Sequence, residues 1–513
     1  MSCESLKFLY QPSKEVDQDF RPLVNSFMEG KEVLFERIES FRQPPKVESN
    51  IPLLALWTEK NFFSIALFED ISFADDFVMM PGTVKNGEYV LNEFNHVFID
   101  FDENKKSTYA NEVHRAIYKL LSTYLGKKLP WGIMTGVRPT KQMLEMNLSG
   151  KDKETIKKFY KEEYLCEEKT IDLGIKVIEN EKKLLSGIDE NNSFSLYVGI
   201  PFCPSICAYC SFSSYSIKQY QKYVDSYVKA VTKEIEAAKN IYKNKKLVSV
   251  YFGGGTPTSI EGAQLEEIIK AVKSNFDFSC VKEFCVEAGR PDSITEEKLE
   301  MLMRNGVDRI SVNPQSMNQE TLDLIGRRHT VEDVINAFLL ARKAGFKNIN
   351  MDLIIGLYGE NPKMLEKTLR AVEELSPESF TMHTLAIKRA ARFNTEKESF
   401  EGMKAEDVAL MENMCLEFAK AHNYKPYYLY RQKNMASGLE NIGFAKEGFE
   451  CLYNVLIMEE RHPILALGAG ASSKLVFKDE NRIERIENVK SVKDYVERID
   501  EMIARKLNVD KWC

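Results

Sequence analysis

Three cysteines lie within eight residues of one another near the middle of the chain, at Cys203, Cys207 and Cys210. Their CxxxCxxC spacing follows a short apolar run, residues 195–200, that is typical of a strand. Three thiolates this close together can hold three irons of a [4Fe–4S] cube, which usually has four cysteine ligands. Because the sequence has no fourth cysteine nearby, the fourth iron would be open to another ligand. The triplet therefore predicts an iron–sulfur cluster with one reactive iron.

Other roles for the triplet are less well supported. A disulfide pair is not expected, because the chain starts without a secretory apolar region and cytosolic thiols stay reduced. Zinc usually takes four ligands at paired spacings, and no partner CxxC or HxxxH is present. Structural cysteines seldom crowd a loop that also carries a proline. The other cysteines are expected to be small core or surface residues: Cys3, Cys166, Cys280, Cys285, Cys415, Cys451 and Cys513.

Polar and glycine residues follow later strand-like segments in the same way. The glycine-rich run 251–258 follows the second, Glu287 ends the third and Gln315 the fourth, with Arg327 and Asp352 further on. Glycines let the backbone approach a ligand, a carboxylate can hold a ribose diol, and an arginine fork can hold a carboxylate. Each residue alone would more simply be a capping or salt-bridged surface group. Their recurrence at corresponding strand ends favours one ligand site.

These residues lie in a regular alternation of strands and helices. Strands are expected at 195–200, 247–252, 283–287, 309–312, 348–354 and 380–385, and helices at 221–242, 263–274, 296–304, 331–344 and 362–374. Six βα repeats of this length predict right-handed crossovers and a parallel sheet. We expect an α/β fold built on a partial (β/α)6 barrel. In barrels, the loops after the strands carry the functional groups.

The flanking regions have different patterns. Residues 1–165 are expected to form an N-terminal α/β domain, with paired strands at 53–57 and 62–68 and a helix at 109–124. A helical linker is expected at 166–193, with its helix at 170–185, followed by the barrel at 194–400. Residues 401–513, with a helix at 405–421 and an aromatic strand at 426–430, predict a C-terminal α+β cap domain.

The composition limits the classes of function. The 513 residues are 44% hydrophobic and 29% charged, with 70 basic and 77 acidic residues and a net charge of −7. This balance is ordinary for a soluble globular protein and is unlike the basic surface of a nucleic-acid binder. No apolar run approaches the roughly 18 residues of a membrane span. We therefore expect a cytoplasmic protein with neither membrane nor nucleic acid as a partner.

Several motifs together resemble the radical S-adenosylmethionine (SAM) superfamily and, within it, the oxygen-independent coproporphyrinogen III oxidase family. The match runs from about residue 194 to the C-terminus. The motifs that carry it are residues 200–212, 253–258, 307–312, 326–329 and 467–472. Three further motifs, at 135–141, 288–292 and 427–435, are similar to the HemZ branch of that family, which has an additional N-terminal domain.

The resemblance implies a [4Fe–4S] cluster and SAM as cofactors. Cys203, Cys207 and Cys210 would hold the cluster, and its open iron would bind the amino and carboxylate groups of SAM. The implied SAM contacts come from the cysteine loop, the glycine loop and the strand ends: Tyr197, Tyr209, Phe212, Gly253, Gly254, Gly255, Thr256, Glu287, Gln315, Arg327 and Asp352.

In this family, an electron enters the cluster and SAM is cleaved to methionine and a 5′-deoxyadenosyl radical. The radical removes a hydrogen from a propionate, carbon dioxide leaves and a vinyl group remains. The resemblance thus implies a tetrapyrrole substrate, coproporphyrinogen III, and a low-potential electron donor. Lys388, Arg389 and Arg431 are candidates for binding substrate carboxylates, with solvated surface charge as the alternative.

The chain departs from two sub-family patterns. Decarboxylating members have a cysteine at the position of Phe212 and a histidine at the position of Gly199. The HemW branch, which handles haem as a chaperone, has a His-Asn-x-x-Tyr-Trp element, whereas the nearest segment here is 451–456 and lacks the histidine and tryptophan. A haem chaperone and another radical SAM tetrapyrrole enzyme, such as one coupling methyl transfer to ring opening, therefore remain alternatives. A tRNA-modifying enzyme is the least supported.

Overall fold

The computed structural model describes residues 5–10, 20–28, 31–37, 53–59, 62–68, 96–100, 106–136, 138–211, 214–385, 404–431, 440–478, 480 and 482–508. The described residues divide into two compact units, one up to residue 175 and one from residue 176 onwards. The division falls inside helix α5 (Glu168–Leu185). The finer division into a linker, a barrel domain and a cap domain stays a prediction.

The first unit contains a mixed sheet with the strand order β2-β1-β3-β4-β5. The expected strand pair is confirmed, because β3 (Leu53–Glu59) and β4 (Phe62–Phe68) are antiparallel neighbours. The apolar sides of α1 and α2 contribute to the same hydrophobic core as the strands. Its remaining elements are β1 (Ser5–Tyr10), α1 (Phe20–Met28), β2 (Glu32–Arg37), β5 (His96–Asp100), α2 (Lys106–Leu125), α3 (Lys141–Leu148) and α4 (Lys153–Glu163).

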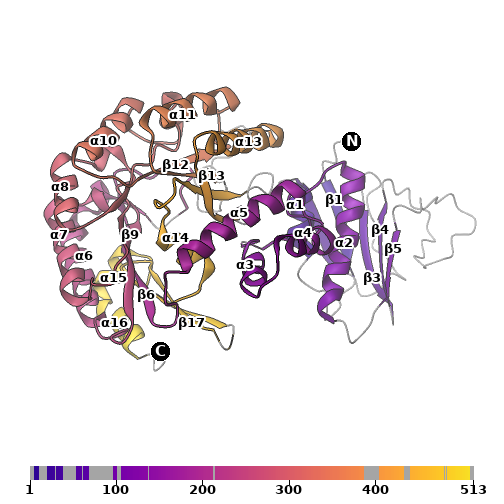
Figure 1. Ribbon diagram of the computed structural model, residues 1–513, viewed down its shortest axis with the longest axis horizontal. Helices are drawn as coiled ribbons and strands as arrows, with labels where there is room; N and C mark the ends of the chain where they lie inside the picture. The colour runs from indigo at the N-terminus through magenta and orange to yellow at the C-terminus, as the bar shows by residue number, and fades with distance from the viewer. Residues whose placement is uncertain are drawn as a thin grey trace, which may run out of the picture. The chain divides into compact units, whose positions relative to one another are not determined.

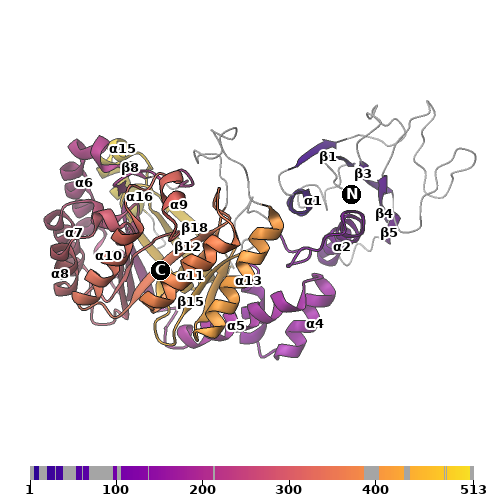
Figure 2. The ribbon, with the colours of Figure 1, turned by 90° about the horizontal axis from the view of Figure 1, so that it is seen from above.

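The second unit is built on six neighbouring parallel strands in sequence order. They are β6 (Ser193–Ile200), β9 (Lys246–Gly254), β10 (Glu283–Val286), β11 (Arg309–Ser311), β12 (Ile349–Ile355) and β13 (Ser379–Thr384). Helices cover the outer face of this curved sheet, as Figures 1 and 2 show. They are α6 (Ile217–Ala238), α7 (Gly262–Asn275), α8 (Glu296–Arg304), α10 (Val331–Lys343) and α11 (Pro362–Leu375), with a short α9 (Gln319–Leu324) before α10.

Local sequence explains where these elements begin. The strands are almost wholly buried, as expected for parallel strands packed on both faces, and therefore read as apolar runs. Helix α10 starts at a capping box in which Thr330 and Asp333 exchange hydrogen bonds with each other's backbone N–H. Asn361 caps α11, where proline occupies the first helical position. The predicted α/β class with a partial (β/α)6 barrel is confirmed.

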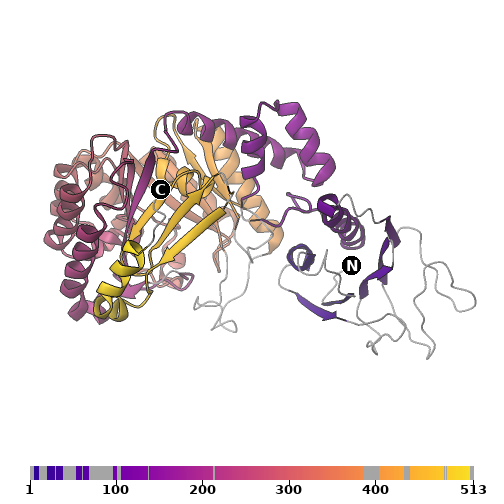
Figure 3. The same cartoon turned by 90° about the horizontal axis from the view of Figure 1, so that it is seen from below.

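The C-terminal residues extend the barrel sheet at both edges, giving an 11-stranded sheet in the described residues. Beyond β13 lie β15 (Asn441–Ala445) and β14 (Lys425–Tyr430), both antiparallel pairings. At the other edge, β16 (Ile464–Leu467) lies parallel to β6 and is followed by β17 (Ser472–Phe477) and β18 (Arg482–Glu487), so that the C-terminal strands, yellow in Figure 3, continue the sheet. The helices of this part are α13 (Ala405–Ala421), α14 (Leu452–Glu459), α15 (Val492–Glu497) and α16 (Ile499–Leu507). Within the described ranges, no helix has the length and apolar character that crossing a membrane requires.

A buried ion pair attaches the C-terminal helices to the barrel. Glu234 on α6 and Lys506 on α16 lie 2.7 Å apart, and each side chain is 1% exposed. The Glu234 carboxylate also accepts hydrogen bonds from the Tyr495 hydroxyl at 2.6 Å, from Asn488 at 2.8 Å and from the Gly468 N–H at 2.8 Å. The network therefore holds the glycine turn after β16 against α6.

Replacing Lys506 with methionine is expected to lower the free energy of unfolding by about 3–5 kcal/mol, because the Glu234 carboxylate would stay buried without its cation. Urea unfolding of the full chain measures the loss. Lys233→Met is the matched control, since Lys233 pairs with Asp500 across the same two helices while 53% exposed. The control should cost at most about 1 kcal/mol. Equal losses of unfolding free energy in the two variants would show that the effect of Lys506→Met does not come from burial of its ion pair.

Candidate active site

The cysteine loop leaves β6 and is fixed at both ends. Its first residues form β7 (Phe202–Cys203), which pairs with β8 (Tyr215–Ser216), and the Tyr215 N–H donates to the Pro201 carbonyl at 2.8 Å. A turn in which the Cys210 N–H donates to the Cys207 carbonyl at 3.1 Å places the last two cysteines close together. All three cysteines are free thiols and line one cavity of about 370 Å³.

The glycine loop after β9 packs directly on the cysteine loop. Because β9 pairs with β6 in register, the loops that follow the two strands meet. The Gly255 N–H donates to the Ile200 carbonyl at 2.8 Å and the Thr256 N–H to the Phe202 carbonyl at 2.7 Å. The Thr256 hydroxyl lies 3.5 Å from the Cys203 sulfur. The Thr256 hydroxyl therefore supplies a donor to the first cysteine, and the backbone hydrogen bonds hold the glycine loop against the start of the cysteine loop.

Burial of Cys203 determines the protonation state of its thiol. It raises the pKa of the Cys203 thiol to about 11, while the Thr256 hydroxyl lowers this pKa in part. A free thiol with this pKa is protonated at neutral pH. Metal ligation requires the thiolate, so proton release must accompany binding of a metal or cluster.

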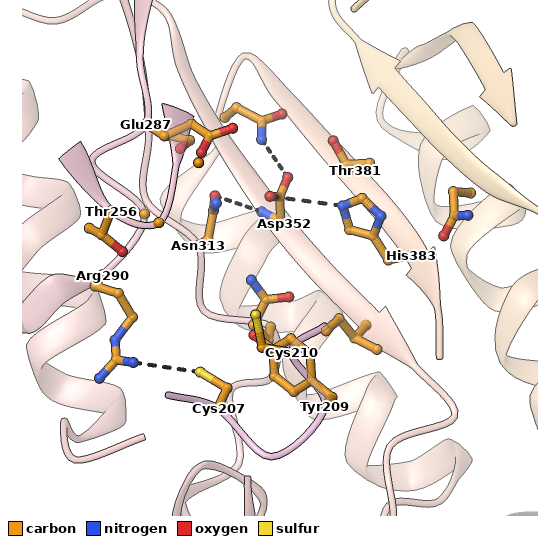
Figure 4. Close-up of a pocket in the computed structure, with 18 of the residues that line it drawn as sticks. Cys207, Tyr209, Cys210, Thr256, Glu287, Arg290, Asn313, Asp352, Thr381 and His383 are labelled. Carbon is orange, nitrogen blue, oxygen red and sulfur yellow. Dashed lines mark hydrogen bonds and ion pairs between the residues drawn. The ribbon is translucent and has the colours of Figure 1, made fainter. Parts of the chain in front are cut away.

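The strand ends bring acidic and amide side chains into the same cavity (Figure 4). Asp352 on β12 accepts a hydrogen bond from Asn350 at 2.7 Å and lies 3.8 Å from His383 on β13. Burial alone would raise the pKa of Asp352, but the partners His383, Asn350 and Thr381 outweigh it and lower the pKa. Asp352 is therefore an ionised acceptor within the cavity.

Glu287, just after β10, is the second carboxyl group of the cavity. Its burial raises its pKa to about 7, and the Tyr251 hydroxyl, which donates to it, offsets part of that rise. The ring of Tyr251 is stacked on Tyr453, with centroids 4.5 Å apart. This support fixes a carboxyl group that changes charge near neutral pH.

Gln315 and Arg327 complete the predicted set. Gln315 has a left-handed backbone with φ of 68°, which is uncommon for a residue with a side chain. Its N–H donates to the Asp352 carbonyl at 2.9 Å, which ties the loop after β11 to β12. Arg327 is 5% exposed and donates to the Tyr209 hydroxyl at 3.2 Å, while its Nε has no hydrogen-bond partner among the described residues. A buried, unsatisfied N–H on a residue that lines this cavity suits an anionic ligand.

Most of the predicted site residues line the cavity, and the exceptions are few. The three cysteines, Tyr209, Gly254, Gly255, Thr256, Glu287, Gln315, Arg327 and Asp352 line it. Tyr197 and Gly253 lie behind the lining, where Tyr197 is stacked on Tyr251 and an ideal Cβ on Gly253 would lie 3.1 Å from Glu287. Arg431 is not among the lining residues, and Phe212, Lys388 and Arg389 lie outside the described residues.

Sequence reasoning missed other residues of the cavity. Arg290, Asn313, His383 and Tyr251 all line it and contact predicted site residues. Arg290 lies in the motif at 288–292 that had no assigned role. His383 follows the pattern of polar strand-end residues, since it lies one residue before the end of β13. That pattern could have found it.

Comparisons with known proteins agree with this geometry. A family model described as the Radical SAM superfamily matches residues 197–372. The chain is 38% identical over 444 residues to the oxygen-independent coproporphyrinogen-III oxidase-like protein HemZ of Bacillus subtilis, a match that covers 85% of this chain and 88% of that protein. This chain belongs to the same family as HemZ, within the radical SAM superfamily. It is also 32% identical over 313 residues to the haem chaperone HemW of Bacillus subtilis, with 60% of this chain and 76% of that protein covered.

The fold is also that of a solved radical SAM enzyme. The chain resembles coproporphyrinogen III oxidase (HemN) from Escherichia coli with a TM-score of 0.51, 23% identity, and coverage of 63% of this chain and 72% of that chain. Radical SAM proteins use a [4Fe–4S] cluster and SAM. The donor set of the cavity fits both groups, because it joins three reduced thiols to carboxylates, an unsatisfied arginine N–H and exposed backbone.

In the part of the chain that the structure describes, the three thiols are not grouped as a site for a single metal ion. Among the described residues, no three His, Cys, Asp or Glu side chains are grouped to hold a single ion. A cube bonds each thiolate to a different iron, so its ligands do not need to meet at one point. Two more cysteines, Cys285 and Cys451, also line the cavity, but they interact with each other, Glu283 and Arg309 rather than with the triplet. They form a separate buried pair.

Proposed function

We propose that this protein is a radical SAM oxidoreductase that converts propionate side chains of coproporphyrinogen III to vinyl groups. The observation that carries the proposal is a cavity in which three thiols of one loop meet SAM-compatible groups from four strand ends. When bound, the reduced cluster and SAM supply the means of removing a hydrogen atom from an unactivated carbon. Each propionate loses that hydrogen atom, carbon dioxide and one electron, and a one-electron acceptor separate from this chain must take up the electron.

The chain's own residues hold and orient the reactants. Cys203, Cys207 and Cys210 would bind iron, and Glu287 would accept hydrogen bonds from the amino group of SAM. Asp352 would accept from the ribose hydroxyls, and Arg327 would donate its unsatisfied Nε to a carboxylate.

The substrate would enter at the side of the cavity formed by β13. His383 lies there at 3.8 Å from Asp352 and 3.5 Å from the Tyr430 hydroxyl, and Thr381 and Thr384 are beside it. These side chains offer hydrogen-bond donors to a propionate carboxylate. We propose Lys388, Arg389 and Arg431 as further carboxylate partners, since a porphyrinogen of this kind carries four negative charges.

One anaerobic assay tests the proposed function. Reconstituted protein is incubated with SAM, dithionite and coproporphyrinogen III, and 5′-deoxyadenosine, carbon dioxide and protoporphyrin are quantified. The proposal requires all three products. If 5′-deoxyadenosine forms without decarboxylation, the radical chemistry is right and the substrate is wrong.

A haem chaperone is the second candidate, favoured by the 32% identity to HemW and by Phe212 at the position where decarboxylating members have cysteine. Titration of the reconstituted protein with haem separates the two functions. A stoichiometric Soret band without decarboxylation would favour the chaperone.

The affinity for SAM is expected to rise about tenfold between pH 6 and pH 8. The SAM amino group would donate to the Glu287 carboxylate, which forms as the pH rises through a pKa of about 7. Glu287→Gln should remove this rise, and Glu360→Gln should keep it, because Glu360 is also buried with a raised pKa but does not line the cavity. Anaerobic calorimetry at each pH measures the affinities. A rise that persists in Glu287→Gln would exclude this carboxylate as the partner of the SAM amino group.

A further inference from the structure

The motif at 288–292 places a buried cation beside the cluster loop. Arg290 follows β10 and Glu287, and its backbone leads into the short 3-10 helix Pro291–Ser293. The residue is 3% exposed. Its Nη1 lies 3.5 Å from the Cys207 sulfur, and Figure 4 shows the guanidinium pointing at that sulfur. The third strand end therefore supplies a donor to the second cysteine.

The remaining donors of Arg290 fix its position. Nε and Nη2 form a fork on Asp292, with distances of 3.0 Å to Oδ1 and 2.8 Å to Oδ2. Nη1 and Nη2 also donate to the carbonyl and hydroxyl oxygens of Ser205, at 3.2 Å and 3.1 Å. The ring of His329 lies near the same carboxylate, with its Nδ1 3.7 Å from Asp292 Oδ1 and without a hydrogen bond to it. The guanidinium is thus held from two sides and has no freedom to turn away from the sulfur.

A fixed cation at this place acts on the electrons of a cluster. Hydrogen bonds to ligating sulfurs, together with net charge and burial, are the main protein controls on the potential of an iron–sulfur cluster. Reduction adds a negative charge, and a buried guanidinium stabilises that charge more strongly than water would. Arg327 is a second cation near the loop: it donates to Tyr209 and to the Asn313 carbonyl, and it also interacts with Cys207.

We propose that Arg290 is a positioning residue that raises the reduction potential of the cluster through its N–H on Cys207. Asp292 orients the Arg290 guanidinium, and its negative charge opposes part of this rise in potential. The inference rests on the proposed cluster ligands and does not depend on which substrate is used. An arginine with a purely structural role would only hold Ser205 and the cysteine loop in place. Only the redox role predicts shifts of opposite sign in the reduction potential for Arg290→Gln and Asp292→Asn.

The test is a redox titration of the reconstituted full chain, followed by the electron paramagnetic resonance signal of the reduced cluster, with iron content as a second readout. Arg290→Gln removes the cation and should disfavour reduction about tenfold, a shift of about 59 mV to more negative potential for one electron. Asp292→Asn leaves the cation and removes an opposing charge, so its potential should become more positive. Arg290→Lys, which keeps the charge, should lie between wild type and Arg290→Gln.

Shifts of the same sign in Arg290→Gln and Asp292→Asn, or no shift in either, would overturn the inference. If Arg290→Gln fails to retain iron, the opposite signs expected for Asp292→Asn and Arg290→Lys still decide the matter. Absence of a [4Fe–4S] signal in the wild-type protein would instead contradict the proposed function. The two failures are therefore distinguishable.

Discussion

Replacing Cys207 with alanine is expected to leave a folded protein that neither retains a [4Fe–4S] cluster nor cleaves SAM. The thiol is one of three ligands, and two thiolates do not hold a cube securely. Because the cofactor supplies the chemistry, formation of 5′-deoxyadenosine should fall on the order of a thousandfold or more. Iron content after anaerobic reconstitution and the yield of 5′-deoxyadenosine measure the two losses.

Cys415→Ala is the matched control for this substitution. Cys415 is also a buried free thiol, on α13, but it does not line the cavity. Its removal should cost about 1 kcal/mol of stability and leave iron content and SAM cleavage at wild-type levels. Normal iron content in Cys207→Ala would show that the ligand set is misassigned.

The barrel could be predicted from sequence because each of its elements leaves a local signal. Strands packed on both faces read as apolar runs, so β12 was placed at 348–354 and lies at Ile349–Ile355. Helix α8 carries its own cap and acidic first turn, and its predicted bounds, 296–304, are those observed. Parallel topology then follows from the lengths of the crossovers.

The pairing of β16 with β6 could not be predicted in this way. These strands are joined residue by residue, from Ile464 opposite Ser195 to Leu467 opposite Val198, although more than 260 residues separate them. The short sequence 464–467 carries no signal for which edge of the sheet this strand will join. Only the packed barrel, with an uncovered edge at β6, selects the partner.

The candidate site likewise has a part that local sequence predicts and a part that depends on the folded structure. The cysteine spacing is local, and the polar strand ends were found because parallel strands present their carboxyl ends at one edge. Arg290 was missed because its role depends on where the chain turns after Glu287, which the helix at Pro291–Ser293 decides. The left-handed backbone of Gln315 is likewise set by its bridge to Leu353, a contact distant in sequence.

The two loops at the heart of the site are also closely interlocked. Backbone hydrogen bonds join Gly255 to Ile200 and Thr256 to Phe202, so the glycine loop and the start of the cysteine loop form one unit. An ideal Cβ on Gly255 would lie 2.5 Å from the Phe202 carbonyl oxygen and 2.9 Å from its carbon. Both atoms are backbone, so no side chain can move aside to make room.

Gly255→Ala is therefore expected to separate the two loops and to weaken SAM binding about a hundredfold or more, because misplacing a site by 1 Å has effects of that size. Gly262→Ala is the control: its Cβ would meet only the flexible Lys298 side chain, at 3.6 Å, and alanine suits the start of α7. Anaerobic calorimetry with SAM measures both variants, and iron content shows whether the cysteine loop survives. Since the clash is with backbone, a Gly255→Ala protein with wild-type SAM affinity would mean that these loops are not packed together.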